Sequence, residues 1–290
     1  MNEASVSDRL FALSQYPLPH HPLSRLMHYL TRCEHPKVKD YLIRKFIDLY
    51  GVDMNQAENP DPDSYAHFNA FFTRALKSGA RPITDEANAV LCPADGAISQ
   101  LGSIDGDRII QAKGMDYSVE TLLGGDPERA EMFQNGSFAT IYLSPKDYHR
   151  LHMPLSGRLR QMVHVPGRLF SVNAATARAV PGLFARNERV AAIFWTDCGP
   201  LALILVGAIF VASIETVWHG VVTPPTQRDP SLWDYTHESI YLDRGAEMGR
   251  FNMGSTIIVL FGEGAMDWSA GLEPGQIVRM GQTLGIANES

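Results

Sequence analysis

The stretch from Val190 to Ile214 constrains the fold most, because it joins two long apolar runs through a tight turn. Val190–Trp195 and Leu201–Ile214 are apolar almost throughout, and Asp197-Cys198-Gly199-Pro200 between them is rich in turn-forming residues. Apolar runs that do not alternate with polar residues are typical of strands covered on both faces. We therefore expect a buried β-hairpin with other elements packed on each side of its sheet.

Short β-rich segments separated by Gly and Pro extend from about Val90 to the end of the chain. Tyr117–Leu123 and Leu169–Phe184 are expected to be helical interruptions of this pattern. The sequence therefore predicts an α+β fold with a mainly antiparallel β core. Residues 81–290 are expected to form one β-rich domain, after a separate helical region at residues 1–80.

The first 80 residues show the spacing of amphipathic helices. Apolar side chains recur three and four residues apart in Pro22–Leu30 and Val38–Tyr50, and a third helix around Phe68–Leu76 is expected after a cap at Asp63 or Ser64. Basic residues outnumber acidic ones in 22–50. Such a segment can lie on an anionic membrane, but these residues alone favour an ordinary helix pair with a solvated charged face.

Composition excludes several classes of protein. The net charge of -7 argues against general nucleic-acid binding, and three scattered cysteines without a CxxC motif argue for a reducing compartment without a disulfide framework. The first residues lack the features of a secretory signal. The longest apolar run, Leu201–Ala212, is too short for a membrane-spanning helix.

A Gly-Ser-Thr tripeptide, Gly254-Ser255-Thr256, directly precedes an apolar β-rich run near the C-terminus. Most such tripeptides are simple turns. The functional alternative is a self-processing bond, in which the Ser255 hydroxyl attacks the preceding carbonyl once a base removes its proton. β-Elimination from the resulting ester would leave a pyruvoyl group at the new N-terminus.

Two other sites could supply the base and an orienting acid. Asp95 stands at a turn before a strand, where a lone Asp-Gly is more often an ordinary turn. His149 and His152 stand three apart, and they could be structural, metal ligands or a base. HxxH alone is a weak metal signature, so no metal is expected. Asp95, His152 and Ser255 have the residue types of an Asp-His-Ser relay, which a serine hydrolase would use on external substrates.

Taken together, the motifs resemble those of the bacterial phosphatidylserine decarboxylase proenzymes, which are pyruvoyl-dependent. The similarity covers nearly the whole chain, and its most specific parts are Tyr142–Pro154 and the Gly-Ser-Thr near the C-terminus. Further matching segments are Phe68–Arg74, Arg81–Ile83, Pro93–Gly96, Gln111–Gly114, Leu183–Arg189 and Glu247–Thr256. Met253 replaces the family's usual Leu, a swap that conserves volume.

The resemblance implies a lyase that decarboxylates phosphatidylserine to phosphatidylethanolamine in phospholipid biosynthesis. Asp95, His152 and Ser255 would then form the relay that cleaves between Gly254 and Ser255. Ser255 would become the pyruvoyl group and form a Schiff base with the substrate, so no external cofactor is needed. His149 is the candidate proton donor, with Tyr148 or water as alternatives.

The resemblance also implies partners and a location. A β chain of residues 1–254 and an α chain of residues 255–290 would stay together as a heterodimer, with room for a higher oligomer. A lipid substrate favours the basic helical segment as the membrane contact. The protein would then be a peripheral protein at the cytoplasmic face of the cell membrane.

Gly275–Gly285 and Pro93–Gly96 resemble parts of lipoyl-type sandwiches, which predicts a barrel-sandwich-like core by analogy alone. A non-catalytic membrane-binding module is the remaining alternative.

Overall fold

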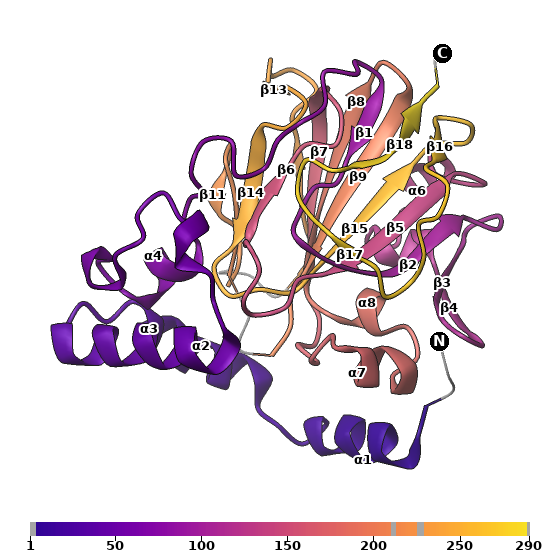
Figure 1. Ribbon diagram of the computed structural model, residues 1–290. Coiled ribbons are helices and arrows are strands. Elements are labelled where there is room, and N and C mark those ends of the chain that lie inside the picture. Colours follow the sequence, from indigo (N-terminus) through magenta and orange to yellow (C-terminus); the bar gives the residue numbers. More distant parts are fainter. Residues whose placement is uncertain (1–3, 210–212, 225–228, 289–290) are drawn as a thin grey trace.

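The computed structural model describes residues 4–209, 213–224 and 229–288, and its N-terminal helices lie beside a stack of β-sheets (Figure 1). The helices of the described residues are α1 (Val6–Gln15), α2 (His20–Thr31), α3 (Pro36–Tyr50), α4 (Phe68–Phe72), α5 (Val119–Leu122), α6 (Pro127–Glu131), α7 (Ala174–Ala179) and α8 (Leu183–Arg186), with 3-10 turns η1 (Met54–Gln56) and η2 (Pro62–Ser64). Over the described ranges, no helix combines the length and the apolar character needed to cross a membrane.

The strands of the described residues fall into four sheets. They are β1 (Ala89–Leu91), β2 (Gly96–Ser103), β3 (Arg108–Ala112), β4 (Met115–Ser118), β5 (Ser137–Tyr142), β6 (Arg150–His152), β7 (Gly157–Val165), β8 (Arg189–Thr196), β9 (Gly199–Val206), β10 (Ile214–Thr216), β11 (Gly220–Val221), β12 (Ser231–Asp234), β13 (Tyr241–Leu242), β14 (Glu247–Phe251), β15 (Thr256–Phe261), β16 (Met266–Trp268), β17 (Ile277–Val278) and β18 (Thr283–Ala287).

The largest sheet has nine strands in the order β12-β7-β8-β9-β15-β5-β2-β17, with β13 also paired to β7. A four-stranded sheet, β11-β10-β14-β6, a three-stranded sheet, β1-β18-β16, and the β3-β4 hairpin complete the set. Every pairing between these strands is antiparallel. The expected α+β class with a mainly antiparallel core is therefore confirmed, and the sheets do not close into a barrel.

Both faces of the large sheet are covered, which explains the apolar runs that do not alternate. In β9, Leu203 and Leu205 point into one core cluster, shared with Phe251 of the four-stranded sheet. Ala202 and Ile204 point into the other cluster, which includes side chains of α5, α7 and α8. Because every position of a central strand contacts apolar neighbours, none of them selects a polar residue.

The predicted hairpin is confirmed as β8 and β9, but its second strand is shorter than expected. β9 ends at Val206, and Ile214 begins β10 in the four-stranded sheet, so the apolar run spans two sheets. The expectation of one strand from Leu201 to Ile214 was wrong because the chain leaves the large sheet after Val206. Residues 210–212 of this run lie outside the described residues.

The N-terminal helices agree only in part with expectation. α2 and α3 confirm the two amphipathic helices, and α3 ends at Gly51, whose φ of 65° lies in the left-handed region. The third helix is only five residues long and is capped by His67, whose Nδ1 accepts from Ala70 N at 3.0 Å. A cap at Asp63 or Ser64 was wrong because these residues form η2, whose first N–H group is capped by Asp61.

Two expected helical interruptions are also shorter than predicted. Tyr117–Leu123 divides between β4 and α5, because Ser118 ends the strand and caps the helix by accepting from Thr121 N. Leu169–Phe184 contains α7 and only the beginning of α8, separated by Val180–Gly182. Capping side chains therefore decide these boundaries more than apolar spacing does.

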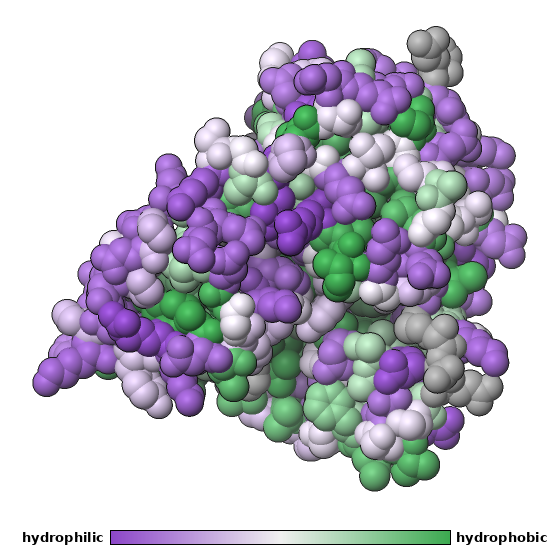
Figure 2. All heavy atoms as spheres, viewed as in Figure 1, coloured by the Kyte–Doolittle hydropathy of each residue, from purple (hydrophilic) through white to green (hydrophobic). Residues whose placement is uncertain are grey.

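The helical region packs on the rest of the chain at two places: α1 contributes Ala12 to the core cluster of α7 and α8 and pairs Asp8 with Arg178 at 3.0 Å, whereas α3 and α4 form a separate small cluster. Ile43 of α3 and Phe68, Phe71 and Phe72 of α4 are buried together, and Met253 packs against them. The outer surfaces of α1, α2 and α3 keep large apolar side chains in solvent: Val6, Leu10, Phe11, Leu13, Leu26, Tyr29, Leu30, Tyr41, Leu49 and Tyr50. Figure 2 shows hydrophobic side chains along the lower edge of the molecule, where Figure 1 places these helices.

Candidate active site

The Gly254–Ser255 bond lies where the chain crosses from one sheet to another. β14 ends at Phe251 in the four-stranded sheet, and β15 begins at Thr256 in the large sheet, between β5 and β9. The carbonyl oxygen of Ser255 accepts from Leu143 N at 2.8 Å, which fixes the start of β15. The Ser255 side chain is 1% exposed, and its Oγ has no hydrogen-bond partner among the described residues. A buried hydroxyl without a partner is unusual, and functional sites are one place where it occurs.

Gly254 is in close contact with an imidazole ring. A Cβ added at Gly254 would lie 1.9 Å from Nε2 of His149, so only a hydrogen atom fits there. His149 is fully buried, and its ring centroid lies 4.0 Å from that of Phe72. The glycine therefore allows this imidazole to lie directly against the backbone beside Ser255.

The protonation of His149 follows from its contacts. Its Nδ1 donates to the carbonyl oxygen of Asp147 at 2.8 Å. Burial, supported by the charge of Arg74 and opposed by the bond to Asp147, lowers the pKa of His149 to about 3. The ring is neutral near pH 7, with its proton on Nδ1 and a lone pair on Nε2. That Nε2 has no hydrogen-bond partner among the described residues, so it is a proton acceptor next to Gly254.

His152 points to different partners. Its Nδ1 donates to the carbonyl oxygen of Gly245 at 2.8 Å, so Nε2 is left to accept from the hydroxyl of Tyr148 at 3.1 Å. Burial lowers the pKa of His152, although the bond to Gly245 opposes the shift. Burial also raises the pKa of Tyr148 to about 12, which keeps the phenol protonated as the donor.

Asp95 is held in a buried ion pair at the start of β2. Its carboxylate accepts from Arg81 Nε at 2.8 Å and from the backbone N–H of Met280 at 2.9 Å, and it also contacts Arg81 Nη2. About a tenth of either side chain is exposed. Among the described residues, no hydrogen bond joins the side chains of Asp95, His152 and Ser255.

The topology nevertheless brings the candidate residues to one edge of the large sheet. β2 begins just after Asp95, its neighbour β5 ends at Tyr142, and β15 begins just after Ser255. His152 is tied to the same edge, because its backbone N–H donates to the carbonyl of Pro93 at 2.9 Å. Residues far apart in sequence thus meet at this edge, while their individual roles stay predictions.

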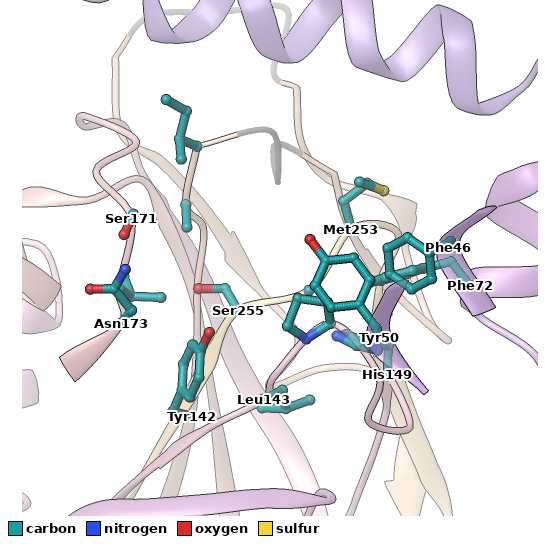
Figure 3. Close-up of a pocket in the computed structure, with 15 residues that line it drawn as sticks. Phe46, Tyr50, Phe72, Tyr142, Leu143, His149, Ser171, Asn173, Met253 and Ser255 are labelled. Atoms are coloured by element: carbon teal, nitrogen blue, oxygen red, sulfur yellow. The ribbon is translucent and has the colours of Figure 1, made fainter. Parts of the chain in front are cut away.

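A cavity of about 220 Å³ opens beside Ser255 and His149. Figure 3 shows Ser255 between His149 on one side and Tyr142, Ser171 and Asn173 on the other, with its hydroxyl directed away from His149. Phe46 and Tyr50 of α3 and Phe72 of α4 also line the cavity. The cavity therefore lies where the N-terminal helices meet the β core.

Several lining residues were not singled out from sequence. Tyr142 lies within the Tyr142–Pro154 motif, and Phe72 within Phe68–Arg74, so both were near a detectable signal. Ser171 and Asn173 precede α7, where Asn173 caps the helix by accepting from Thr176 N, and nothing in their local sequence marks a site. In the residues that the structure describes, no group of three or more His, Cys, Asp and Glu side chains is arranged to hold a metal ion.

Comparison with known proteins agrees with this arrangement. The family model described as phosphatidylserine decarboxylase matches residues 68–286, and a second model, described as PSD, matches residues 10–51. Titratable groups at a sheet edge, beside a cavity and a buried serine, are features of an enzyme, and the chain belongs to the phosphatidylserine decarboxylase family. It is therefore an enzyme, as the sequence predicted.

Named relatives extend the match over nearly the full chain. Phosphatidylserine decarboxylase proenzyme from Azotobacter vinelandii is 57% identical over 286 residues, which cover 98% of this chain and 100% of the relative. The proenzyme from Bordetella pertussis is 59% identical and covers 96% of this chain and 95% of its own length. The proenzyme from Pseudomonas aeruginosa is 57% identical and covers 99% and 100%.

Proposed function

We propose that this protein decarboxylates phosphatidylserine to phosphatidylethanolamine through a pyruvoyl group that it makes from its own Ser255. Membership of the family supports the reaction, and one observation supports the self-processing: a buried Ser255 hydroxyl that has no partner among the described residues follows a glycine that has no room for a side chain. A serine that is 1% exposed is better placed to attack its own chain than an external ester. This favours self-cleavage over a serine hydrolase.

The cleavage step needs a base near the Ser255 hydroxyl. Oγ attacks the carbonyl carbon of Gly254, the proton leaves to an imidazole, and the peptide bond rearranges to an ester before elimination. In the proposed relay His152 takes the proton and Asp95 orients His152. In the described conformation Asp95 is paired with Arg81, and both ring nitrogens of His152 are engaged, Nδ1 with the Gly245 carbonyl and Nε2 with Tyr148, so the relay requires His152 to exchange these bonds.

His149 has a separate proposed role in decarboxylation. A pyruvoyl group at position 255 supplies a ketone that condenses with the substrate amine and withdraws electrons as carbon dioxide leaves. A proton must return to the α-carbon of the product. His149 is the proposed carrier, because its Nε2, which has no hydrogen-bond partner in the described part of the chain, lies against residue 254 and can take up a proton and release it.

The two products of cleavage are proposed to stay together as a heterodimer. Residues 255–290 include β15, which pairs with β5 on one side and β9 on the other, and β17 and β18, which pair with β2 and β1. Removing this segment would expose the centre of both core clusters. This strand pairing therefore supports a stable heterodimer of the two chains.

The N-terminal helices are proposed to hold the enzyme on the cytoplasmic face of an anionic membrane as a peripheral protein. Their exposed apolar side chains, such as Leu26, Tyr29 and Leu49, would enter the lipid, and the basic residues of 22–50 would face the phosphates. Phe46 and Tyr50 of α3 line the cavity beside Ser255, so a lipid head group would reach the site at this junction.

A denaturing intact-mass spectrum of the purified protein tests the proposal. Two chains that meet at Gly254/Ser255, the smaller one lighter by one ammonia than a peptide that starts with Ser, would support it. A single full-length chain that persists after incubation with anionic lipid would contradict self-processing.

The same spectrum separates the two histidines. His152→Ala is expected to stay uncleaved, whereas His149→Ala is expected to cleave and then decarboxylate slowly. A His149→Ala protein that stays uncleaved while His152→Ala is processed would transfer the base role to His149, whose Nε2 is the nearer to Gly254 in this conformation. A His149→Ala protein that decarboxylates at the wild-type rate would remove His149 from the proton transfer.

A further inference from the structure

A second cavity, of about 260 Å³, lies on the other side of the Ser144–His149 loop. Pro145 and His149 of this loop line the cavity beside Ser255, whereas Lys146, Asp147 and Tyr148 line the second one. Of the residues that the structure describes, none lines both cavities. The loop is therefore a wall between two separate spaces, and only one of them contains Ser255.

Arg74 is the least exposed of the described charged residues that line the second cavity. Its side chain is 5% exposed, and its Nη2 donates to the carbonyl of Lys146 at 3.2 Å. Its Nε and Nη1 have no hydrogen-bond partner among the described residues. The guanidinium also lies 5.4 Å from the ring centroid of Phe71, a contact that stabilises the charge but does not use these N–H groups. A buried cation with unused donors is costly without an anion or water beside it.

The carboxylates that line this cavity accept hydrogen bonds from other groups, and Asp53 accepts from Asn55 N at 3.0 Å and from Gln56 Nε2 at 2.7 Å. Asp95 accepts from Arg81 and from the Met280 backbone, and Asp147 accepts from Ser144 N at 2.7 Å. No ion pair of Arg74 is found in the described part of the chain. Arg74 thus keeps a positive charge whose neighbours are already engaged elsewhere.

The cavity as a whole favours an anion. Its lining contains four cationic side chains, Arg74, Arg81, Lys146 and Arg279, and three carboxylates, Asp53, Asp95 and Asp147. The Arg81–Asp95 pair is internally neutral, and Lys146 and Arg279 are exposed at the rim. A net positive lining in a chain of net charge -7 is a local reversal that attracts oxyanions.

We propose that this cavity is a binding site for a phosphate-type oxyanion, with the buried Arg74 guanidinium as its floor and Lys146 as a cation at its mouth. Guanidinium groups match the geometry of phosphate oxygens, and charge-assisted hydrogen bonds of this kind are among the strongest in proteins. The anion is either free phosphate or the phosphodiester of a lipid head group. Asp95 of the proposed relay also lines this cavity, but Ser255 is not among its described lining residues, so the proposal does not rest on the decarboxylation step.

Titration calorimetry of the full chain with inorganic phosphate tests the site, and glycerophosphoserine is the second probe. We expect saturable binding of phosphate, weakened at least about tenfold in Arg74→Gln and less in Arg74→Lys, which keeps the charge. Competition by glycerophosphoserine would assign the site to a lipid head group, and binding of phosphate alone would assign it to the free ion. Saturation by neither probe would overturn the proposal, because water then suffices for Arg74.

Two further variants keep the test decisive. Lys146→Gln changes an exposed residue, so it reports on the site even where Arg74→Gln does not fold, and it is expected to weaken phosphate binding severalfold. Arg108→Gln removes an exposed arginine of β3 that pairs with Asp116 outside the cavity, and it is the matched control with unchanged binding. Equal affinity in wild type, Arg74→Gln and Lys146→Gln would overturn the proposal. None of these readouts depends on lipid turnover, so a failed decarboxylase assay leaves them interpretable.

Discussion

The β core and the N-terminal helices use apolar side chains in opposite ways. In β9 and β15 the apolar side chains are buried on both faces, and Leu203 and Leu260 are fully inaccessible. In the helices, Leu10 and Leu49 remain more than half exposed. The difference shows that the core is complete in water, whereas the helices present an apolar surface that the fold itself does not cover.

One contact between the two regions lies beside the Gly254–Ser255 bond. Met253 packs against the cluster of α3 and α4, and the Asn69 side chain donates to the carbonyl of Asn252. Ser255, two residues after Met253, leads into the central strand β15. The proposed reactive position is therefore held between a rigid sheet and a helical region whose outer surface suits lipid.

The largest effect is expected at this junction, from Gly254→Ala. The added Cβ would overlap His149 Nε2, so the bond or the ring must move and self-cleavage should be lost. Intact-mass analysis measures the cleaved fraction. Met253→Leu conserves volume next to the same bond and should cleave as wild type. Normal cleavage of Gly254→Ala would show that the close contact with His149 has no role in processing.

A Leu→Ala substitution should reduce stability much more in the β core than in the N-terminal helices. Leu203→Ala removes a fully buried side chain and should lower the free energy of unfolding by about 2–5 kcal/mol. Leu49→Ala, in a residue that is 66% exposed, should change it by less than about 0.5 kcal/mol. Urea unfolding followed by circular dichroism measures both. Equal losses would mean that the helical surface is part of the cooperative core.

For vesicle binding, substitutions in the N-terminal helices should have a larger effect than a substitution in the β domain. The double change Leu26→Ser and Tyr29→Ser removes two side chains that are 55% and 76% exposed, and partitioning onto anionic vesicles should fall at least about tenfold. Co-sedimentation measures the bound fraction. Leu232→Ser, which changes a 54% exposed side chain on β12, is the matched control. Unchanged binding of the double variant would remove α2 from the membrane contact.

A further expected effect is a pH dependence that arises from the buried His149. The pKa of His149 falls from 6.5 to about 3 on folding, so the unfolded chain binds the extra proton between these values. The contribution of His149 to stability is therefore fully present above about pH 6.5. Below that value the free energy of unfolding should decline by about 1.4 kcal/mol per pH unit. The lowered pKa of His152 acts in the same direction. His149→Gln should reduce this slope between about pH 6.5 and pH 5 in urea unfolding, and an unchanged slope would contradict the burial argument.

The sequence predicted the hairpin of β8 and β9 well because non-alternating apolar runs require a sheet covered on both faces. It predicted the helices α2 and α3 from spacing, but spacing says only that one face is apolar. Leu26 and Leu30, on the expected buried face of α2, are in fact exposed. Whether an apolar face meets protein or lipid depends on the neighbours, which a single segment does not contain.

The candidate site was predictable as a set of residues but not as a set of contacts. Asp95, His149, His152 and Ser255 belong to recognisable motifs, and the sheet brings them to one edge. The pairing of Asp95 with Arg81 and the contact of His149 with Gly254 depend on side-chain packing across long loops. No local pattern encodes these distances. The assignment of His152 as the base for Ser255 therefore rests on residue types and the family resemblance, and it stays a prediction.

The position of β15 has a consequence for the lifetime of the enzyme. Under the proposed cleavage, the reactive group lies directly before β15, a strand that is hydrogen-bonded to neighbours on both sides. The same small chain also contributes β16 and β18 to the three-stranded sheet. A damaged small chain could not be exchanged for a fresh one without unfolding the whole particle. Each molecule would mature once, and repair would mean synthesis of a new copy.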